Sequence, residues 1–273
     1  MHHAGSDVPP THNHAQRIMT PRSLAAIIMA AGQGKRMKNP DMAKVMHTLD
    51  GLPLVQHVVR LARAAGAERI IVIVGHQRHS VIEYLRAAEP DVEFAVQEQQ
   101  LGTGHAVQQA IPLLRDFDGD ILILSGDAPM TRVRTVRDAI ELHLDAAADA
   151  TVLTAVLPDP TGYGRVLRDE AGRIVRIVEH KDASDEERGV REINSGMYVF
   201  RKDALFDALA RITNDNAQGE YYLPDVFAIF AREHRVMLPC VVDSFDELRG
   251  VNTVEQLQEL ELLYAALRRE ERN

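Results

Sequence analysis

The sequence is poor in cysteine, because Cys240 is the only one among 273 residues. A single thiol cannot form an internal disulfide, so it is expected to pack as a small hydrophobic group in a reducing compartment. The chain also lacks any apolar run that approaches the ~20 residues needed to cross a bilayer. We therefore predict a cytoplasmic protein with no membrane partner.

An excess of basic residues is missing as well. Lysine and arginine total 31 against 40 aspartate and glutamate residues, which gives a formal net charge of −9. Proteins that bind nucleic acid usually carry a basic face that displaces phosphate counterions, so no nucleic-acid partner is expected. A small anionic ligand remains compatible with this charge, because it needs only a local positive site.

Residues 1–22 have no apolar signal-peptide core and no hydrophobic periodicity, but they contain His2, His3, His12 and His14. We predict a disordered extension there. A metal-binding tail is the alternative, although no second set of ligands at fixed spacing accompanies the histidines. The absence of a repeat of fixed period excludes a solenoid. We place one domain at 23–252 and a C-terminal helix at 253–273, which is compatible with a homo-oligomer.

Short apolar runs alternate with amphipathic segments through the first half of the chain. Strands are predicted at 24–29, 69–74, 92–96 and 120–124, and helices at 54–65, 80–88 and 103–114. This alternation predicts an α/β, Rossmann-like fold that binds its ligand at the carboxyl ends of the strands. Strands at 151–156, 164–168, 173–179 and 193–200 carry turn signals between them, so the sheet is expected to be mixed and mainly parallel.

A glycine loop, Gly32-Gln33-Gly34, follows the first strand and is trailed by Arg36 and Lys44. Glycines allow a close approach of backbone N–H groups to phosphate oxygens, and two fixed cations suit transfer at a polyphosphate. The dinucleotide fingerprint and the P-loop both fail, because the required glycine and Gly-Lys-Ser/Thr residues are absent. An ordinary turn with solvated cations is the alternative.

Two further strand ends carry polar side chains. Asp127 follows the strand at 120–124 and can hold Mg²⁺ on nucleotide phosphates, or it can cap a helix. Gln97 offers one donor and one acceptor group that can read a pyrimidine edge. Thr103 opens the next helix toward a phosphate or base, or it serves only as the N-cap.

Seven segments in order resemble the bacterial N-acetylglucosamine-1-phosphate uridyltransferases, over about residues 24–265. They are MAAGQGKRM (29–37), KVMH (44–47), QQLGTGHA (99–106), DPTGYGR (159–165), IVEHKDA (177–183), EINSG (192–196) and AQGEYY (217–222). The resemblance implies a nucleotidyltransferase fold of the GT-A-like type. It also implies an Mg²⁺-dependent enzyme of cell wall biosynthesis that makes UDP-N-acetylglucosamine, a peptidoglycan precursor, from UTP and N-acetylglucosamine 1-phosphate.

The resemblance assigns roles to individual positions. Those implied around the uridine are Met29, Ala30, Ala31, Gly32, Gln97, Gly102 and Thr103, and those around the acetylated sugar are Gly164, Glu179 and Asn194. Arg36 and Lys44 match the cationic positions on the triphosphate. Asp127 and Asn252 match the magnesium ligands, although Asn252 taken alone reads as a helix N-cap before Thr253.

The chain also departs from the family pattern. Lys35 stands where a threonine is usual, Ala43 replaces a proline before Lys44, and the loop between Arg36 and Lys44 is one residue longer. Ser125 replaces a tyrosine beside the nucleotide. No hexapeptide-repeat acetyltransferase segment occurs before residue 273, so only the uridylyl activity is expected. The alternatives are a transferase for glucose 1-phosphate with UTP or dTTP, and a non-catalytic regulator that binds nucleotide sugars.

Overall fold

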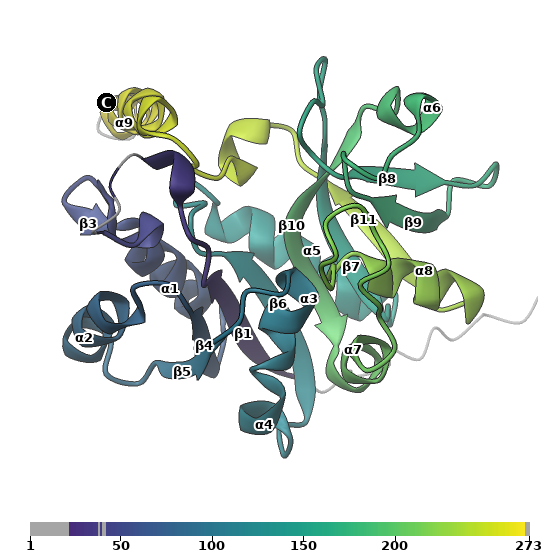
Figure 1. Cartoon of the computed structure of the whole chain (residues 1–273), viewed down its shortest axis with the longest axis horizontal. Helices are drawn as coiled ribbons and strands as arrows, with labels where there is room; N and C mark the ends of the chain where they lie inside the picture. The colour runs from purple at the N-terminus through teal and green to yellow at the C-terminus, as the bar shows by residue number, and fades with distance from the viewer. Residues whose placement is uncertain (1–21, 38, 40–41, 271–273) are drawn as a thin grey trace, which may run out of the picture.

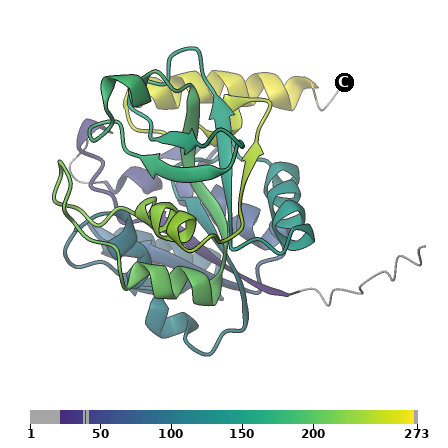
Figure 2. The same cartoon turned by 90° about the vertical axis from the view of Figure 1, so that its right-hand side faces the viewer.

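One large mixed sheet forms the centre of the molecule, and helices cover both of its faces (Figures 1 and 2). This computed structural model describes residues 22–37, 39 and 42–270. The predicted extension at 1–22 lies outside the described residues except for Arg22. Among the described helices, none combines the length and apolar character that crossing a bilayer requires.

The strand order of the large sheet is β11-β7-β10-β6-β1-β4-β5, with β8 and β9 joined to it through β10. Its strands are β1 (Ser23–Ala30), β4 (Arg69–Val74), β5 (Glu93–Val96), β6 (Gly119–Ser125), β7 (Ala150–Val156), β8 (Arg165–Arg168), β9 (Ile174–Val178), β10 (Glu192–Arg201) and β11 (Met237–Val241). A small hairpin pairs β2 (Thr48–Leu49) with β3 (Leu52–Pro53). The run β6-β1-β4-β5 is parallel, as the alternation of strands and helices predicts.

Nine helices and three 3₁₀ turns are found among the described residues. They are α1 (Leu54–Ala65), α2 (Arg78–Ala88), α3 (Thr103–Gln108), α4 (Ile111–Leu114), α5 (Val133–Asp145), α6 (Asp185–Arg188), α7 (Lys202–Leu209), α8 (Asp225–Arg232) and α9 (Val254–Glu270), with 3₁₀ turns η1 (Lys35–Met37), η2 (Lys44–Met46) and η3 (Phe245–Leu248). Helices α1, α2 and α5 contribute to one core cluster, and α3, α7 and α8 contribute to the other. Figure 2 shows α5 and the α7–α8 pair on opposite sides of the strands.

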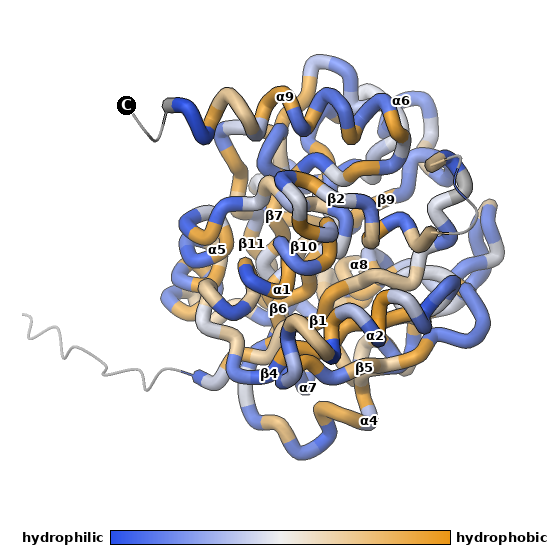
Figure 3. Tube along the Cα trace, turned by 90° about the vertical axis from the view of Figure 1, so that its left-hand side faces the viewer, coloured by the Kyte–Doolittle hydropathy of each residue, from blue (hydrophilic) through white to orange (hydrophobic). Residues whose placement is uncertain are grey.

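Alternation of side chains along the buried strands builds these two cores. In β1, Ala25 and Ile27 face the α3 side, whereas Ala26 and Ile28 face the α1 side. All four are fully buried, and burial of one large aliphatic side chain stabilises a fold by about 1.5–3 kcal/mol. In Figure 3 the central strands are accordingly hydrophobic while the outer turns are hydrophilic.

The second half is antiparallel where the turn signals predict it. The β8–β9 hairpin turns at residues 170–172, and β10 runs antiparallel to β6, β7 and β8. The pairing of β10 with β7 shifts between Asn194 and Tyr198, next to Gly196, whose φ is +80°. This irregularity sets the direction of Asn194, a predicted sugar-binding residue. β11 joins β7 in parallel and was not anticipated.

One predicted segment differs in detail. The helix expected over 103–114 is broken after Gln108, because Pro112 lies in the first turn of α4 and cannot donate a backbone hydrogen bond. Between β9 and β10, the short helix α6 begins with a capping box that Ser184 and Glu187 form. A C-terminal helix, α9, spans Val254–Glu270, and its Leu260 belongs to the same hydrophobic cluster as Met37.

Candidate functional site

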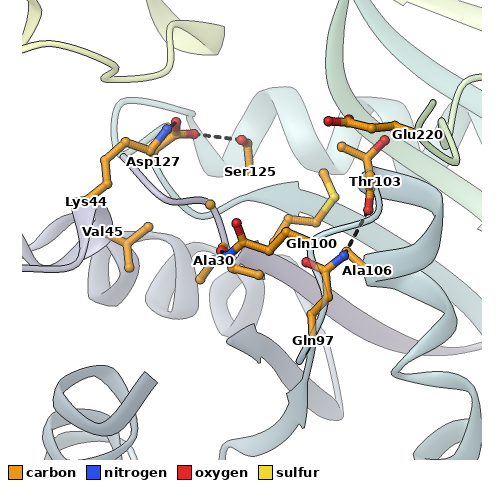
Figure 4. Close-up of a pocket in the computed structure, with 14 residues that line it drawn as sticks. Ala30, Lys44, Val45, Gln97, Gln100, Thr103, Ala106, Ser125, Asp127 and Glu220 are labelled. Carbon is orange, nitrogen blue, oxygen red and sulfur yellow. Dashed lines mark hydrogen bonds and ion pairs between the residues drawn. The ribbon is translucent and has the colours of Figure 1, made fainter. Parts of the chain in front are cut away.

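A cavity of about 290 Å³ opens at the carboxyl ends of β1, β5 and β6. Its lining residues are Met29, Ala30, Ala31, Gly32, Lys44, Val45, Gln97, Gln100, Gly102, Thr103, Ala106, Ser125, Asp127 and Glu220. Ligands of open α/β sheets bind at this edge of the strands. In Figure 4, Lys44 and Asp127 lie at one end of the cavity, and Thr103 and Glu220 lie at the other.

The cavity brings together all seven residues that the sequence predicts around a uridine, and it also includes Lys44 and Asp127. Five predicted site residues lie outside this lining, namely Arg36, Gly164, Glu179, Asn194 and Asn252. Asn252 is linked to the cavity through Lys44. The three residues predicted to hold the sugar form a separate cluster.

Lys44 is the centre of the polar corner. Its ammonium contacts the Asp127 carboxylate and donates a 3.1 Å hydrogen bond to Oδ1 of Asn252. The hydroxyl of Ser125 donates to the other carboxylate oxygen of Asp127 at 2.7 Å. The carboxylate of Asp127 is therefore held from both sides.

Three segments far apart in the sequence meet at this corner. Gly34 of the glycine loop lies against Lys44, because a Cβ placed on Gly34 would stand 2.7 Å from that of Lys44. The backbone N–H of Val251 donates to the carbonyl oxygen of Asp127 at 2.9 Å, which brings Asn252 alongside. The glycine loop, the end of β6 and the segment before α9 thus converge on one positive charge.

Oxygen atoms of Asp127 and Asn252 point to the same Lys44 nitrogen, so they already converge on a cation. Carboxylate and amide oxygens suit Mg²⁺, which usually takes one or two protein carboxylates and completes its shell with water and substrate phosphates. Within the described part of the chain, no group of three or more His, Cys, Asp or Glu could hold a metal by itself. This donor set fits an ion that is shared with a polyphosphate.

The alternative that Asp127 and Asn252 serve only as helix N-caps is wrong. α5 begins at Val133 with Arg132 as its N-cap, so Asp127 caps no helix there. Before α9, the side chain of Thr253 accepts from the N–H of Gln256 at 3.2 Å, whereas Asn252 Oδ1 accepts from Lys44.

The other end of the cavity is built around Gln97, which is 4% exposed. Its amide nitrogen donates to the carbonyl oxygen of Gly102 at 3.0 Å. Gly102, with φ of +109°, is the N-cap of α3, and Thr103 instead accepts a 3.0 Å hydrogen bond from the N–H of Leu223. Thr103 therefore ties α3 to the segment before α8 and does not cap its own helix.

Gly102 also meets the 217–222 segment at close range. A Cβ on Gly102 would lie 2.5 Å from the carbonyl oxygen of Tyr221, which itself accepts from the N–H of Gly104 at 2.7 Å. Only glycine can lie so close to Tyr221. The same contact places the neighbouring residue Glu220 in the cavity wall.

Gly164 precedes β8, Glu179 follows β9 and Asn194 is in β10, and the three residues lie together. A Cβ on Gly164 would be 3.4 Å from Cβ of Asn194 and 3.6 Å from Oε1 of Glu179. The amide of Asn194 is oriented by donating to the Tyr198 hydroxyl at 2.8 Å. Burial raises the pKa of Glu179, and the carboxylates of Asp182, Asp225 and Glu220 raise it further. Glu220 therefore lies near both the cavity and this cluster.

Arg36 lies on η1, is exposed and does not line the cavity. Its charge acts on the hydroxyl of Tyr163, as does that of Asp127, while burial is the main cause that raises the pKa of Tyr163.

Five lining residues were not predicted, namely Val45, Gln100, Ala106, Ser125 and Glu220. Gln100 donates to the carbonyl oxygen of Ala31 at 2.7 Å and so fixes the backbone of the glycine loop. All except Ser125 lie inside the family-like segments, which is the signal that could have identified them. Ser125 was noted only as a departure from the family.

Residues 25–245 match the family model described as Nucleotidyl transferase. Among curated proteins, the chain is 48% identical over 235 residues to the Bifunctional protein GlmU of Pelobacter propionicus and 49% identical over 236 residues to that of Geobacter metallireducens. Each alignment covers 86% of this chain but 51% and 49% of the relative, so the chain spans about half the length of these relatives.

A solved structure of UDP-glucose pyrophosphorylase complexed with UDP-glucose superposes with a TM-score of 0.72 and covers 90% of this chain and 99% of its own. Its sequence is 18% identical, so the likeness concerns the fold alone. The predicted fold class, a mixed and mainly parallel α/β sheet of the nucleotidyltransferase type, is confirmed.

Proposed function

Because the chain belongs to the nucleotidyl transferase family, we propose that it is a uridylyltransferase that forms UDP-N-acetylglucosamine and pyrophosphate from UTP and N-acetylglucosamine 1-phosphate. The observation that carries the proposal is the gathering of Met29, Gly32, Gln97, Lys44 and Asp127 around one cavity at the strand ends. The cluster of Glu179 and Asn194 beyond Glu220 supplies polar partners for a sugar.

The reaction needs no nucleophilic side chain. An oxygen of the sugar phosphate attacks the α-phosphorus of UTP, the bond from that phosphorus to the bridging oxygen breaks, and pyrophosphate leaves. Transfer of this kind depends on position and on neutralised charge. The ammonium of Lys44 and the N–H groups of the glycine loop are suited to the phosphates, and Arg36 is assigned to the outer part of the triphosphate.

Mg²⁺ belongs to the proposal as the ion that neutralises phosphate charge when it is bound by Asp127 and Asn252. Ser125 then orients the Asp127 carboxylate, and Val251 holds its backbone. Gly164, Glu179 and Asn194 are assigned to the acetylated sugar. A place in the cytoplasm, supplying precursors for the cell wall, completes the proposed function.

A panel of pyrophosphate-release assays tests the proposal. UTP, dTTP, CTP and ATP are each paired with N-acetylglucosamine 1-phosphate and with glucose 1-phosphate, with Mg²⁺ or with a chelator. The proposal expects the highest kcat/KM for UTP with the acetylated sugar, and none with the chelator. A higher value for glucose 1-phosphate would replace the substrate, and no release with any pair would favour a nucleotide-sugar-binding regulator.

A further inference from the structure

His105, in α3, lies beside Gln97 and takes no part in the function proposed above. The amide nitrogen of Gln97 is 3.0 Å from the carbonyl oxygen of Gly102 and 3.1 Å from Nδ1 of His105. A carboxamide nitrogen carries two hydrogens and accepts none, so these two contacts use both of its donors. Because a backbone carbonyl only accepts, the contact with Gly102 favours the orientation in which the amide nitrogen faces inward, and Nδ1 of His105 is a second acceptor for that nitrogen.

The contact also determines where the imidazole carries its proton. Nδ1 of His105 must accept from Gln97, so the proton of the neutral ring is on Nε2. The amide nitrogen of Gln109 lies 3.2 Å from Nε2, but a neutral ring accepts at one nitrogen only. Gln97 is 4% exposed and also donates to Gly102, whereas the less buried Gln109 donates to the carbonyl oxygen of His105 at 2.9 Å. The buried glutamine therefore sets the tautomer.

Only Oε1 of Gln97 then remains for a ligand. In Figure 4 this oxygen points away from the hydrogen bond of the amide nitrogen, toward the side of the cavity where Ala30 and Gln100 lie. Uracil and thymine carry a hydrogen on N3, whereas N3 of cytosine is an acceptor. A fixed acceptor therefore binds the first two bases and repels the third, because two facing acceptors leave both groups unpaired.

We propose that His105 is a positioning residue for base specificity: together with the Gly102 carbonyl it holds the amide nitrogen of Gln97, so that only the acceptor Oε1 faces the base and selects UTP over CTP. The inference deepens the proposed uridylyltransferase function and rests on a nucleotide base binding at Gln97. His105 acts through Gln97 and touches no substrate.

The test measures binding of UTP and CTP by calorimetry in the full chain with Mg²⁺ present, so that no turnover is needed. The parent is expected to bind UTP about 10- to 100-fold more tightly than CTP, because a buried group left without its hydrogen bond lowers the affinity by about this factor. In His105→Leu this ratio is expected to fall at least about threefold, since the Gly102 carbonyl alone then holds the amide nitrogen. An unchanged ratio in a folded His105→Leu protein overturns the proposal.

Two polar variants separate positioning from packing. Asparagine can place an acceptor oxygen where Nδ1 stands, so His105→Asn is expected to keep the ratio. Glutamine reaches the position of Nε2, so His105→Gln is expected to lose it, and it replaces His105→Leu if that protein fails to fold. A general structural role would weaken UTP and CTP equally in every variant, and that outcome rejects the proposal.

The outcome is distinguishable from failure of the proposed function. If the protein forms no nucleotide sugar but its ratio falls in His105→Leu and in His105→Gln, the role of His105 stands without the reaction. If UDP-N-acetylglucosamine forms and the ratio is unchanged, the reaction stands and the role of His105 is rejected. The KM for the sugar phosphate is expected to remain within about twofold in all variants, since His105 is in α3 whereas the residues assigned to the sugar lie at β8, β9 and β10.

Discussion

The ammonium of Lys44 contacts the carboxylate of Asp127, which lies 83 positions further along the chain. The pair joins the loop after β1 to the end of β6, and Asn252 joins it from the segment before α9. Neither charge is fully buried, because the side chains are 15% and 11% exposed. Bound phosphates can therefore exchange places with these contacts without opening the core.

Replacement of Asp127 tests the magnesium assignment. Asp127→Ala is expected to lower kcat at saturating substrates by about a hundredfold or more, because it removes a charged ligand at the reacting phosphates. It is also expected to abolish Mn²⁺ binding to the UTP complex, measured by electron paramagnetic resonance. Asp138→Ala, at an exposed position of α5, is the matched control. A folded Asp127→Ala protein with parental turnover would remove Asp127 from the metal site.

Glu179 is predicted to act on the sugar. In Glu179→Ala the KM for N-acetylglucosamine 1-phosphate should rise about 10- to 100-fold, because hydrogen-bonding groups of the sugar lose a buried partner. The KM for UTP should stay within about twofold. Initial rates with each substrate varied in turn measure both constants, and exposed Glu186→Ala serves as the control. Equal increases in both constants would contradict the assignment.

A comparison of Gly102 with Gly162 measures how much free energy of unfolding a close contact at a glycine costs when a Cβ is added. Both have positive φ, +109° and +87°, but a Cβ on Gly162 would meet nothing within 4 Å, whereas one on Gly102 would meet Tyr221. Gly162→Ala should cost about 1–2 kcal/mol of unfolding free energy, and Gly102→Ala should cost more. Urea denaturation measures both losses. Equal losses would show that the backbone at Tyr221 shifts to accommodate the added Cβ at no cost in free energy.

His143 is expected to make the protein sensitive to acid. Burial, and then the charges of Arg22 and Arg201, lower its pKa from 6.5 to about 4. The folded protein binds a proton at His143 less readily than the unfolded chain does. Its free energy of unfolding is therefore highest above pH 6.5, the unfolded pKa, and falls as the pH drops toward 4. The loss amounts to about 3 kcal/mol at the acid end.

Urea denaturation of the parent and His143→Gln, between about pH 7.5 and pH 4.5, measures this effect. The parent is expected to lose stability more steeply than the variant over this range. Asp120, whose pKa is raised chiefly by burial, responds in the opposite direction, and its carboxylate lies 4.0 Å from Nε2 of His143, so the comparison is repeated in an Asp120→Asn background. Parallel curves would reject the role of His143.

The sequence was sufficient for those parts of the site that follow strand ends. Gln97 and Asp127 come directly after buried apolar runs, and parallel strands bring such ends to one edge. The contact of Lys44 with Asn252 could not be derived in this way, because 208 positions separate them and no local pattern fixes their distance. Only the family resemblance pointed to both residues.

The rest of the fold shows the same limit. β11 contains Pro239 and has no clear alternation, so its parallel pairing with β7 comes from tertiary contacts and not from its own sequence. The break between α3 and α4 was readable from Pro112, but the regular apolar spacing over 103–114 favoured a single helix. Ser125 was recognised as a departure, yet its hydrogen bond to Asp127 required coordinates.

The position of Asn252 has a consequence for protein engineering. The family match ends at residue 245, after the last strand of the large sheet, whereas the oxygen that faces Lys44 comes from residue 252 and Leu260 of α9 belongs to the same hydrophobic cluster as Met37 beside the glycine loop. A fragment or chimera joined at the family boundary would retain every strand and still lose part of the polar corner. The smallest exchangeable unit therefore extends into α9, beyond Leu260.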